Sequence, residues 1–190
     1  MRPSFSIISH AIAAATLLLA SAAQANVVTN GSFETGDFTG WTPTGITTFN
    51  GVFCPGPGPS VQSGNCSAFF GPLGGLGGIT QTLATVAGAA YDISFWTQAD
   101  GFTPSEIVFN WDGGANEFDQ VNPPAGGFVL HSFQLVASSA STTIAFSFRN
   151  DPSFIFLDNV VVDASVPEPT SLALVGLAIA GLGAMRRRRQ

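Results

Sequence analysis

The chain has 190 residues, of which 45% are hydrophobic and only 9% are charged, and its formal net charge is −6 at pH 7. All six basic residues are arginines, and five of them lie near the chain ends, at Arg2 and Arg186–Arg189. The segment 26–165 therefore holds eleven acidic residues against one arginine, Arg149, which gives it a net charge of −10. This charge argues against nucleic acid as a partner, because binding to it needs basic patches that neutralise phosphates.

The first 25 residues have the three regions of a secretory signal peptide. Arg2 supplies the positive start, Ile12–Ala20 is the apolar stretch, and Ala23-Gln24-Ala25 fits the cleavage site. We therefore expect export and a mature protein that begins at Asn26, with an uncleaved membrane anchor as the alternative. The remaining segment, 26–165, is long enough for one domain with a hydrophobic core.

The pattern between residues 26 and 165 predicts β-strands throughout. Apolar and polar residues alternate in Ala90–Gln98 and Thr142–Arg149, which is typical of strands with one buried face. Further strands are predicted at Ile79–Ala84, Glu106–Trp111, Phe128–Ala137 and Phe154–Asp163. Turn signals separate these runs, and no segment has a helical pattern. We predict an all-β domain, an antiparallel β-sandwich.

The stretch from Cys54 to Gly78 is rich in proline and glycine, and we expect it to be irregular. Cys54 and Cys66 are the only cysteines of the chain, and such a pair in an exported protein predicts a disulfide. A zinc site is not expected, because it needs more His and Cys ligands. Gly71–Gly78 lacks the pattern of a phosphate loop and is expected to connect two strands flexibly.

The sequence offers little for catalysis. His131 is the only histidine between residues 26 and 165, and the GxSxG pattern of a nucleophile elbow is absent. We therefore predict that the protein is not an enzyme. Asp112, Glu117 and Asp119 cluster, so a glycan-active enzyme that uses paired acids is the alternative. A solvated acidic surface explains the same cluster.

Aromatic residues are the better candidates for a binding site. Sugars bind to flat ring faces with a few polar groups nearby. Trp41, Trp96 and Trp111 and the cationic Arg149 are the residues that we select for this role. The alternative is that the three tryptophans fill the core of the sandwich or its rim.

The last 25 residues, 166–190, form a segment of another kind. Val166-Pro167-Glu168-Pro169 cannot hold regular structure, 171–185 is uncharged and mostly apolar, and 186–189 is a run of arginines. We expect a transmembrane helix at 171–185 with its basic end on the cytoplasmic side, and a buried core helix is the alternative. The pattern resembles the PEP-CTERM sorting tail of Gram-negative bacteria. This resemblance implies recognition by an exosortase-type enzyme, removal of the tail, and release or attachment at the cell surface.

Three stretches of the mature domain carry a second resemblance. They are Asn30-Gly31-Ser32-Phe33-Glu34, Leu157-Asp158-Asn159-Val160 and 79–96, and they resemble jelly-roll carbohydrate-binding modules of the galactose-binding-like class. The region 49–78 departs from that pattern.

The second resemblance implies a jelly-roll sandwich and a structural Ca²⁺, held by Glu34 and Asp158 with backbone carbonyls and with Asn30 as a plausible neighbour. Two ordinary solvent-facing acids are the alternative. From both resemblances we expect a non-catalytic protein of the cell surface or extracellular matrix, with polysaccharide as its candidate ligand.

Overall fold

The structure is a computed structural model, and it describes residues 26–165. The predicted signal peptide, 1–25, and the predicted sorting tail, 166–190, lie outside the described residues, and so does the transmembrane helix expected at 171–185. Within the described part of the chain, no helix is long and apolar enough to cross a membrane.

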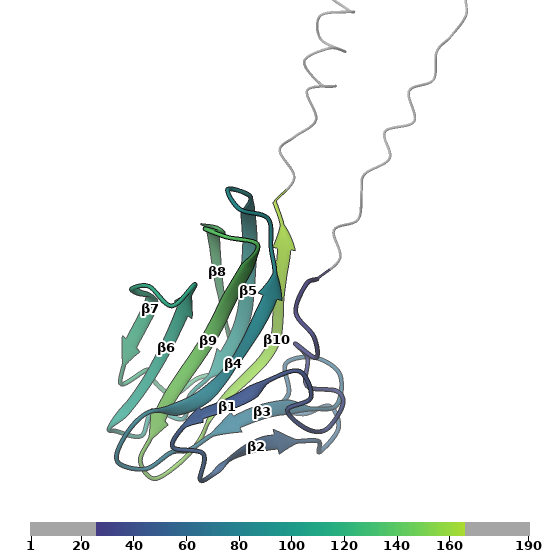
Figure 1. The fold of residues 1–190 in the computed structure, drawn as a ribbon. Helices are drawn as coiled ribbons and strands as arrows, with labels where there is room; N and C mark the ends of the chain where they lie inside the picture. The colour runs from purple at the N-terminus through teal and green to yellow at the C-terminus, as the bar shows by residue number, and fades with distance from the viewer. Residues whose placement is uncertain (1–25, 166–190) are drawn as a thin grey trace, which may run out of the picture.

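Ten strands form two five-stranded antiparallel sheets that pack face to face (Figure 1). The strands are β1 (Thr42–Gly45), β2 (Asn50–Phe53), β3 (Ser67–Phe70), β4 (Gly77–Ala84), β5 (Ala90–Gln98), β6 (Ser105–Trp111), β7 (Asn116–Val121), β8 (Val129–Val136), β9 (Ser141–Asn150) and β10 (Ile155–Ala164). Sheet A has the order β1-β4-β9-β6-β7, and sheet B has the order β2-β3-β10-β5-β8. The predicted all-β antiparallel sandwich is therefore confirmed.

The core lies between the two sheets and is built largely from phenylalanine rings. Burial alternates along β5 and β9, as the period-two pattern predicts. Phe70 stacks on Phe148 with ring centroids 4.3 Å apart, and Phe95 meets Phe146 edge to face at 4.9 Å. These four rings are fully buried. The burial of each one contributes roughly 1.5–3 kcal/mol to the stability of the fold.

Four strands were not predicted, namely β1, β2, β3 and β7. The first three have only four residues each, too few for a period to be read. β7 lies within the acidic cluster, for which no strand was predicted, and its half-buried Phe118 and Gln120 alternate with exposed Glu117 and Asp119.

The end of the glycine-rich stretch is not a flexible connection, because Gly77 and Gly78 begin β4 and are buried. A Cβ atom on Gly77 would overlap the backbone oxygen of Ile46, and one on Gly78 would overlap that of Phe146. Glycine is therefore required here so that neighbouring backbones can approach closely.

The segment between β2 and β3, residues 54–66, is closed by the predicted Cys54–Cys66 disulfide, and we call it the disulfide loop. It packs against sheet B. Ser67 of β3 donates its hydroxyl to the carbonyl oxygen of Ser60 at 2.6 Å, and Val61 is buried.

The two ends of the described domain lie together. The Asn26 side chain donates to the carbonyl oxygen of Val160 at 3.2 Å and accepts the N–H of Val162 at 2.9 Å. The N–H of Ser165 bonds to the carbonyl oxygen of Ala90 at 2.8 Å. Residues 26 and 165 therefore leave the sandwich on the same side (Figure 1).

Candidate functional site

Four phenylalanines form an apolar depression on the outer face of sheet B. Phe69 of β3 and Phe156 of β10 are register partners that point away from the core, and Phe154 packs edge to face on Phe69 at 5.3 Å. With Phe53 of β2 they line a cavity of about 260 Å³. Phe53 is 47% exposed and Phe154 is 37% exposed, so their ring faces are open to solvent.

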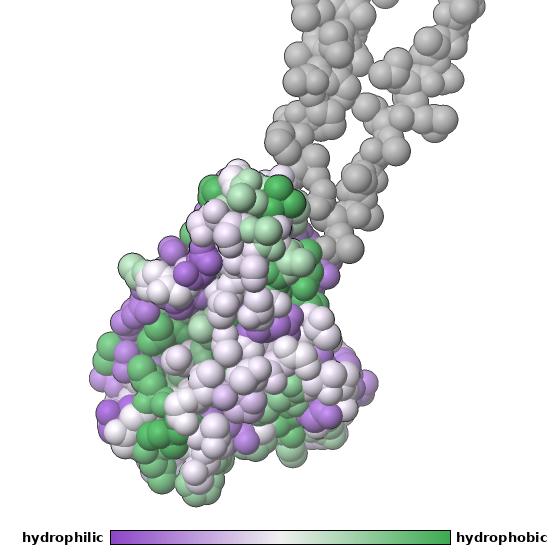
Figure 2. All heavy atoms as spheres, in the orientation of Figure 1, coloured by the Kyte–Doolittle hydropathy of each residue, from purple (hydrophilic) through white to green (hydrophobic). Residues whose placement is uncertain are grey.

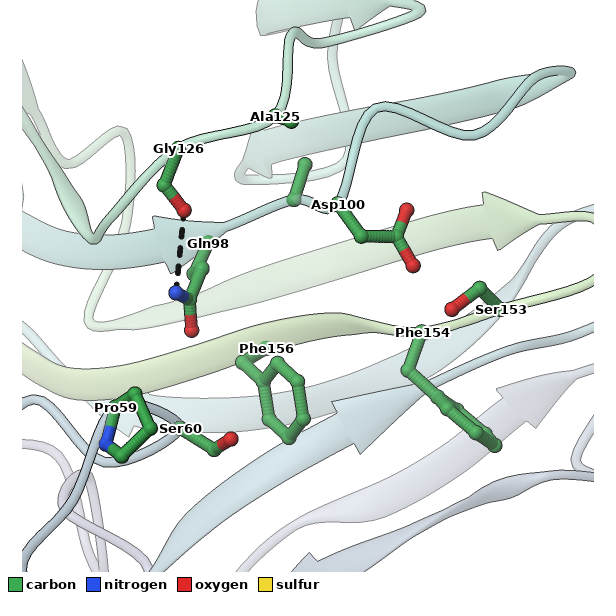
Figure 3. Close-up of a pocket in the computed structure, with 10 residues that line it drawn as sticks. Pro59, Ser60, Gln98, Asp100, Ala125, Gly126, Ser153, Phe154 and Phe156 are labelled. Atoms are coloured by element: carbon green, nitrogen blue, oxygen red, sulfur yellow. Dashed lines mark hydrogen bonds between the residues drawn. The ribbon is translucent and has the colours of Figure 1, made fainter.

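A second cavity, of about 290 Å³, adjoins the first and shares Phe154 and Phe156 with it (Figure 3). Its remaining lining brings polar groups, from Ser60, Gln98, Asp100 and Ser153. We call the two adjoining cavities the aromatic groove. It combines flat ring surfaces with a hydrogen-bonding rim.

The polar rim of the groove is held in place by hydrogen bonds. Gln98 donates its side-chain N–H to the carbonyl oxygen of Gly126 at 3.1 Å, and the Asp100 carboxylate points toward Ser153 (Figure 3). Burial acts to raise the pKa of Asp100, but hydrogen bonds from Ser153, Asn150 and the backbone prevail and hold it below its usual value. Asp100 is therefore ionised at neutral pH.

The disulfide loop forms one wall of the groove, because Pro59 and Ser60 line it. Two carboxylates hold this loop. Glu34 accepts the N–H groups of Asn65 and Cys66 at 2.8 and 3.0 Å, and these bonds lower its pKa. Asp158 accepts the N–H groups of Gln62 and Ser63 at 2.9 and 3.1 Å. The two acids named from the sequence thus meet at one loop.

Asp158 is fully buried, and its charge is only partly compensated. Burial raises its pKa most and the nearby charge of Glu34 raises it further, against the N–H groups that lower it. The one ion pair among residues 26–165 is Arg149–Asp151, so no basic side chain of the described part neutralises Glu34 or Asp158.

The oxygen donors around Glu34 and Asp158 are of the chemical kind that a calcium ion binds. Gln62, whose N–H bonds to Asp158, also has a buried side-chain oxygen without a hydrogen-bond partner. Two neighbouring carboxylates and an unpartnered amide oxygen are hard donors of the kind that Ca²⁺ prefers. Within residues 26–165, no group of three His, Cys, Asp or Glu side chains is placed to bind a metal. Backbone carbonyls or water would therefore have to complete the coordination.

Two of the three selected tryptophans belong to the core. Trp41 and Trp111 are 5% and 4% exposed, and their indole N–H groups donate to the carbonyl oxygens of Asn30 and Val136. They offer no open ring face to a ligand. Trp96 is half-buried on the outer face of sheet B, two residues before Gln98, but it lines neither cavity of the groove.

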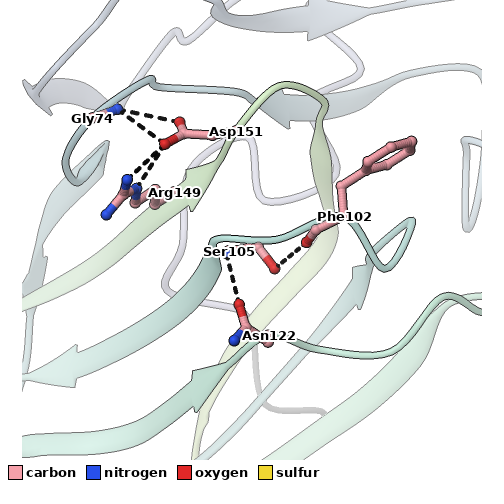
Figure 4. Close-up of polar contacts among 6 residues, drawn as sticks. All are labelled: Gly74, Phe102, Ser105, Asn122, Arg149 and Asp151. Carbon is pink, nitrogen blue, oxygen red and sulfur yellow. Dashed lines mark hydrogen bonds and ion pairs between the residues drawn. The ribbon is translucent and has the colours of Figure 1, made fainter.

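Arg149 lies on the other sheet, away from the groove. Its guanidinium donates twice to one oxygen of Asp151, at 2.6 and 3.1 Å, and Asp151 also accepts the N–H of Gly74 (Figure 4). These bonds hold the pKa of Asp151 below its usual value.

The middle of sheet A's outer face is pale in Figure 2, and small residues such as Thr80, Ala145 and Ser147 point outward there.

The alternative catalytic acids lie outside the two cavities of the groove. Asp112 accepts a hydrogen bond from the Ser138 hydroxyl, and Glu117 and Asp119 are exposed on β7. None of the three lines the groove. His131 is half-buried in β8, where its Nε2 lies 2.8 Å from the Thr97 hydroxyl and burial lowers its pKa.

The groove residues were not predicted from the sequence, because only the tryptophans were selected as candidate ring faces. A signal was present, since Phe154 and Phe156 flank Ile155, the first residue of β10, and Phe69 lies shortly before a glycine-rich stretch. Phenylalanine is so frequent in this chain, with 17 residues, that the outward-facing rings cannot be separated from the core rings without the register.

Solved structures that match this fold include carbohydrate-binding modules and parts of larger enzymes. The module TmCBM61, solved in complex with β-1,4-galactotriose, matches with a TM-score of 0.59 and 18% identity, over 74% of this chain and 99% of that one. A xylan-binding domain of family CBM22 matches with a TM-score of 0.52 and 16% identity, over 75% and 99% of the two chains. An α-L-arabinofuranosidase, MgGH51, matches over only 26% of its own length, with a TM-score of 0.53 and 12% identity. The domain thus has the jelly-roll fold of carbohydrate-binding modules.

The end of the chain is recognised separately. Residues 165–189 match the family model of the PEP-CTERM protein-sorting motif, as the sequence indicated. The chain therefore carries a PEP-CTERM sorting motif, which implies export and processing by an exosortase. A search of the curated proteins found no match.

Proposed function

We propose that the protein is a non-catalytic component of the cell surface or extracellular matrix that binds polysaccharide in the aromatic groove. The observation that carries this proposal is the set of four outward-facing rings, Phe53, Phe69, Phe154 and Phe156, beside a polar rim. The jelly-roll fold that the domain shares with carbohydrate-binding modules supports it.

The groove has the chemistry that sugar recognition needs. Pyranose rings present apolar C–H faces that pack on aromatic rings, while a few polar groups fix their orientation. Two adjoining cavities along one face suit consecutive sugar units of a chain. The net charge of −10 and the ionised Asp100 disfavour anionic polysaccharides, so a neutral chain is the preferred ligand.

Sorting would bring this binding domain to its place of action. The signal peptide directs export, and the PEP-CTERM tail holds the chain at the membrane until an exosortase removes it. The processed protein, 26–165, then acts at the surface or in the matrix, where extracellular polysaccharide is its partner.

A structural Ca²⁺ is part of the proposal. Glu34 and Asp158 would hold it, and the ion would neutralise their uncompensated charges. Both residues bind the disulfide loop, so the ion would keep the wall of the groove in position.

The test is affinity electrophoresis and calorimetry of the processed protein with neutral polysaccharides, namely β-1,4-galactan, xylan and the host's own exopolysaccharide. We expect binding to at least one of them and a loss of tenfold or more in Phe154→Ser, because an exposed ring of the groove is removed. Phe102→Ser is the matched control, since Phe102 is 55% exposed but lies outside the groove. Absence of binding in the wild type, or an equal loss in both variants, would overturn the proposal.

A further inference from the structure

Strand β8 leaves a long and uncharged edge of sheet B open. It pairs with β5 on one side, and among residues 26–165 no strand pairs with its other side. Its eight residues, VLHSFQLV, include no acid, lysine, arginine, proline or glycine. Val129, Leu130 and Val136 are 56%, 47% and 59% exposed.

The backbone groups that face this open edge can be assigned. Ala137 bonds through its N–H to the carbonyl oxygen of Ala89, so it faces β5. Val136 instead accepts the Trp111 indole N–H, at 3.1 Å, and so faces away from β5. Because direction alternates along an antiparallel strand, Leu130, Ser132 and Gln134 also present their N–H and C=O groups to the open edge.

The other edge strands are protected against pairing, and β8 is not. β7 carries exposed Glu117 and Asp119, β1 contains Pro43, and β2 has four residues and runs into the disulfide loop. Charges, proline and short length are the means by which natural proteins block edge pairing. A long edge strand that lacks all of them is suited to adding a strand.

We propose that β8 is an interaction surface for a second copy of this chain. Two β8 strands pair antiparallel about a two-fold axis at Ser132 and join the five-stranded sheets B of both copies into one continuous sheet. In this register Ser132 lies opposite the partner's Ser132, and Leu130 lies opposite the partner's Gln134.

The sequence of β8 is complementary to itself in this register. In the pairs Ser132–Ser132 and Leu130–Gln134, the backbone N–H and C=O groups of both residues face the open edge, so each of these pairs exchanges two N–H···O bonds. The exposed side chain of Val136 lies opposite the partner's Phe128 on the outer face. The carbonyl oxygen of Val136 already accepts the Trp111 indole N–H, so the pairing does not rely on a hydrogen bond to it. On the inner face, Phe133 and Leu135 are only half-buried, and the added strand covers them.

Charge also favours a copy that approaches through β8. Each domain carries a net charge of −10, so two copies repel each other over most of their surfaces. β8 is a long uncharged strand at which this repulsion is least. Pairing should therefore strengthen with salt, which screens the remaining repulsion.

The direction of the strands connects pairing with processing. β8 and β10 both run antiparallel to β5, so they run parallel to each other. In an antiparallel β8 pair the two β10 strands point in opposite directions, and the two Ser165 residues lie at opposite ends. Copies whose tails sit in the same membrane cannot meet in this way, so pairing belongs to the protein released from its tail.

Cross-linking of the processed protein tests the register. Ser132→Cys places two cysteines opposite each other at the axis, at a backbone separation that a disulfide can span, and we expect a covalent dimer under oxidising conditions. Gln134→Cys is the matched control, since it lies on the same strand face but opposite Leu130, and should form no covalent dimer. Equal cross-linking of both variants, or none of Ser132→Cys, would overturn the proposed register.

Sedimentation measurements on the same protein test the surface itself. We expect a reversible dimer for the wild type, tighter at 0.5 M than at 0.05 M NaCl, and at least tenfold weaker in Leu130→Lys. Val121→Lys adds the same charge at a 65% exposed position of β7 and should leave the dimer intact. A wild type that remains monomeric at several hundred micromolar, or a dimer that Val121→Lys weakens equally, would exclude β8 as the interface. Sugar binding is not used in either measurement, so their outcome is independent of the proposed function.

Discussion

Glu34 and Asp158 come from opposite ends of the domain, yet they hold neighbouring stretches of the same loop. Glu34 bonds to the N–H groups of Asn65 and Cys66, and Asp158 bonds to those of Gln62 and Ser63. The charge of Glu34 raises the pKa of Asp158, which burial already raises. The beginning of the domain, its last strand and the wall of the groove are thereby linked in one place.

Calcium is expected to stabilise the processed protein through these two acids. A ligand that binds only the native state adds about 2.7 kcal/mol at a hundredfold excess over Kd. For a domain of this size we expect the Tm to rise by roughly 5–10 °C. Thermal unfolding with Ca²⁺ and with Mg²⁺ measures the effect, and Mg²⁺ controls for general screening of the negative charge. The Ca²⁺-specific shift should vanish in Asp158→Ala and persist in Asp119→Ala; a shift that survives in Asp158→Ala would exclude this site.

The disulfide is expected to support both stability and binding. It closes a loop with a sequence separation of 12, for which the loop-entropy model gives about 3 kcal/mol. The Cys54→Ser, Cys66→Ser double variant should therefore unfold at lower urea concentration and bind polysaccharide less tightly, because Pro59 and Ser60 lose their fixed position. Mass spectrometry of the non-reduced exported protein should find no free thiol. Full alkylation of both cysteines without reductant would contradict the disulfide.

His131 makes stability depend on pH. Burial lowers its pKa, so the unfolded chain takes up a proton more readily than the native protein. The contribution of His131 to the free energy of unfolding is therefore complete above about pH 6.5. This contribution is lost as the pH falls from there toward the lowered pKa of His131 in the native protein. Urea midpoints at pH 7.5 and 5.5 should differ less in His131→Gln than in the wild type. An identical difference in both proteins would mean that carboxyl groups alone cause the pH dependence.

Gly51 is expected to control the position of one ring of the groove. A Cβ atom at this position would lie 2.7 Å from Cζ of Phe69, so Gly51→Ala must displace that ring. We expect polysaccharide binding to weaken several-fold with a change in the free energy of unfolding below about 1 kcal/mol, since the ring lies outside the core. Gly114→Ala is the control, because a Cβ there meets only the Trp111 carbonyl oxygen, at 3.9 Å. Unchanged binding in Gly51→Ala would show that Phe69 does not contact the ligand.

Processing of the tail can be tested in a host that has the exosortase. Replacement of Pro167-Glu168-Pro169 by alanines should leave a membrane-bound precursor that retains its C-terminus. Immunoblots of membrane and secreted fractions with an N-terminal epitope tag on the mature chain distinguish the two forms. A normally processed protein would show that these residues are not the signal.

The sequence predicted the longer strands and the disulfide because each depends on a local pattern. β5 begins and ends at the predicted residues, Ala90 and Gln98, since its alternation is unbroken. β2 and β3 are too short to carry such a pattern. The groove could not be predicted, because it depends on which side chains of β3 and β10 become neighbours, and that is set by the register between strands far apart in the sequence.

β10 separates the groove from the point where the described domain ends. The strand begins beside Phe154 and ends at Ala164, just before the chain enters the sorting tail. Its ten residues span about 33 Å at the usual rise of a strand. The groove, lined by Phe154 and Phe156, therefore lies at the opposite end of β10 from the residues that lead into the sorting motif. Under the proposed function, this separation lets the groove bind a polysaccharide strand before the tail is removed, and cleavage then releases the domain with its ligand bound.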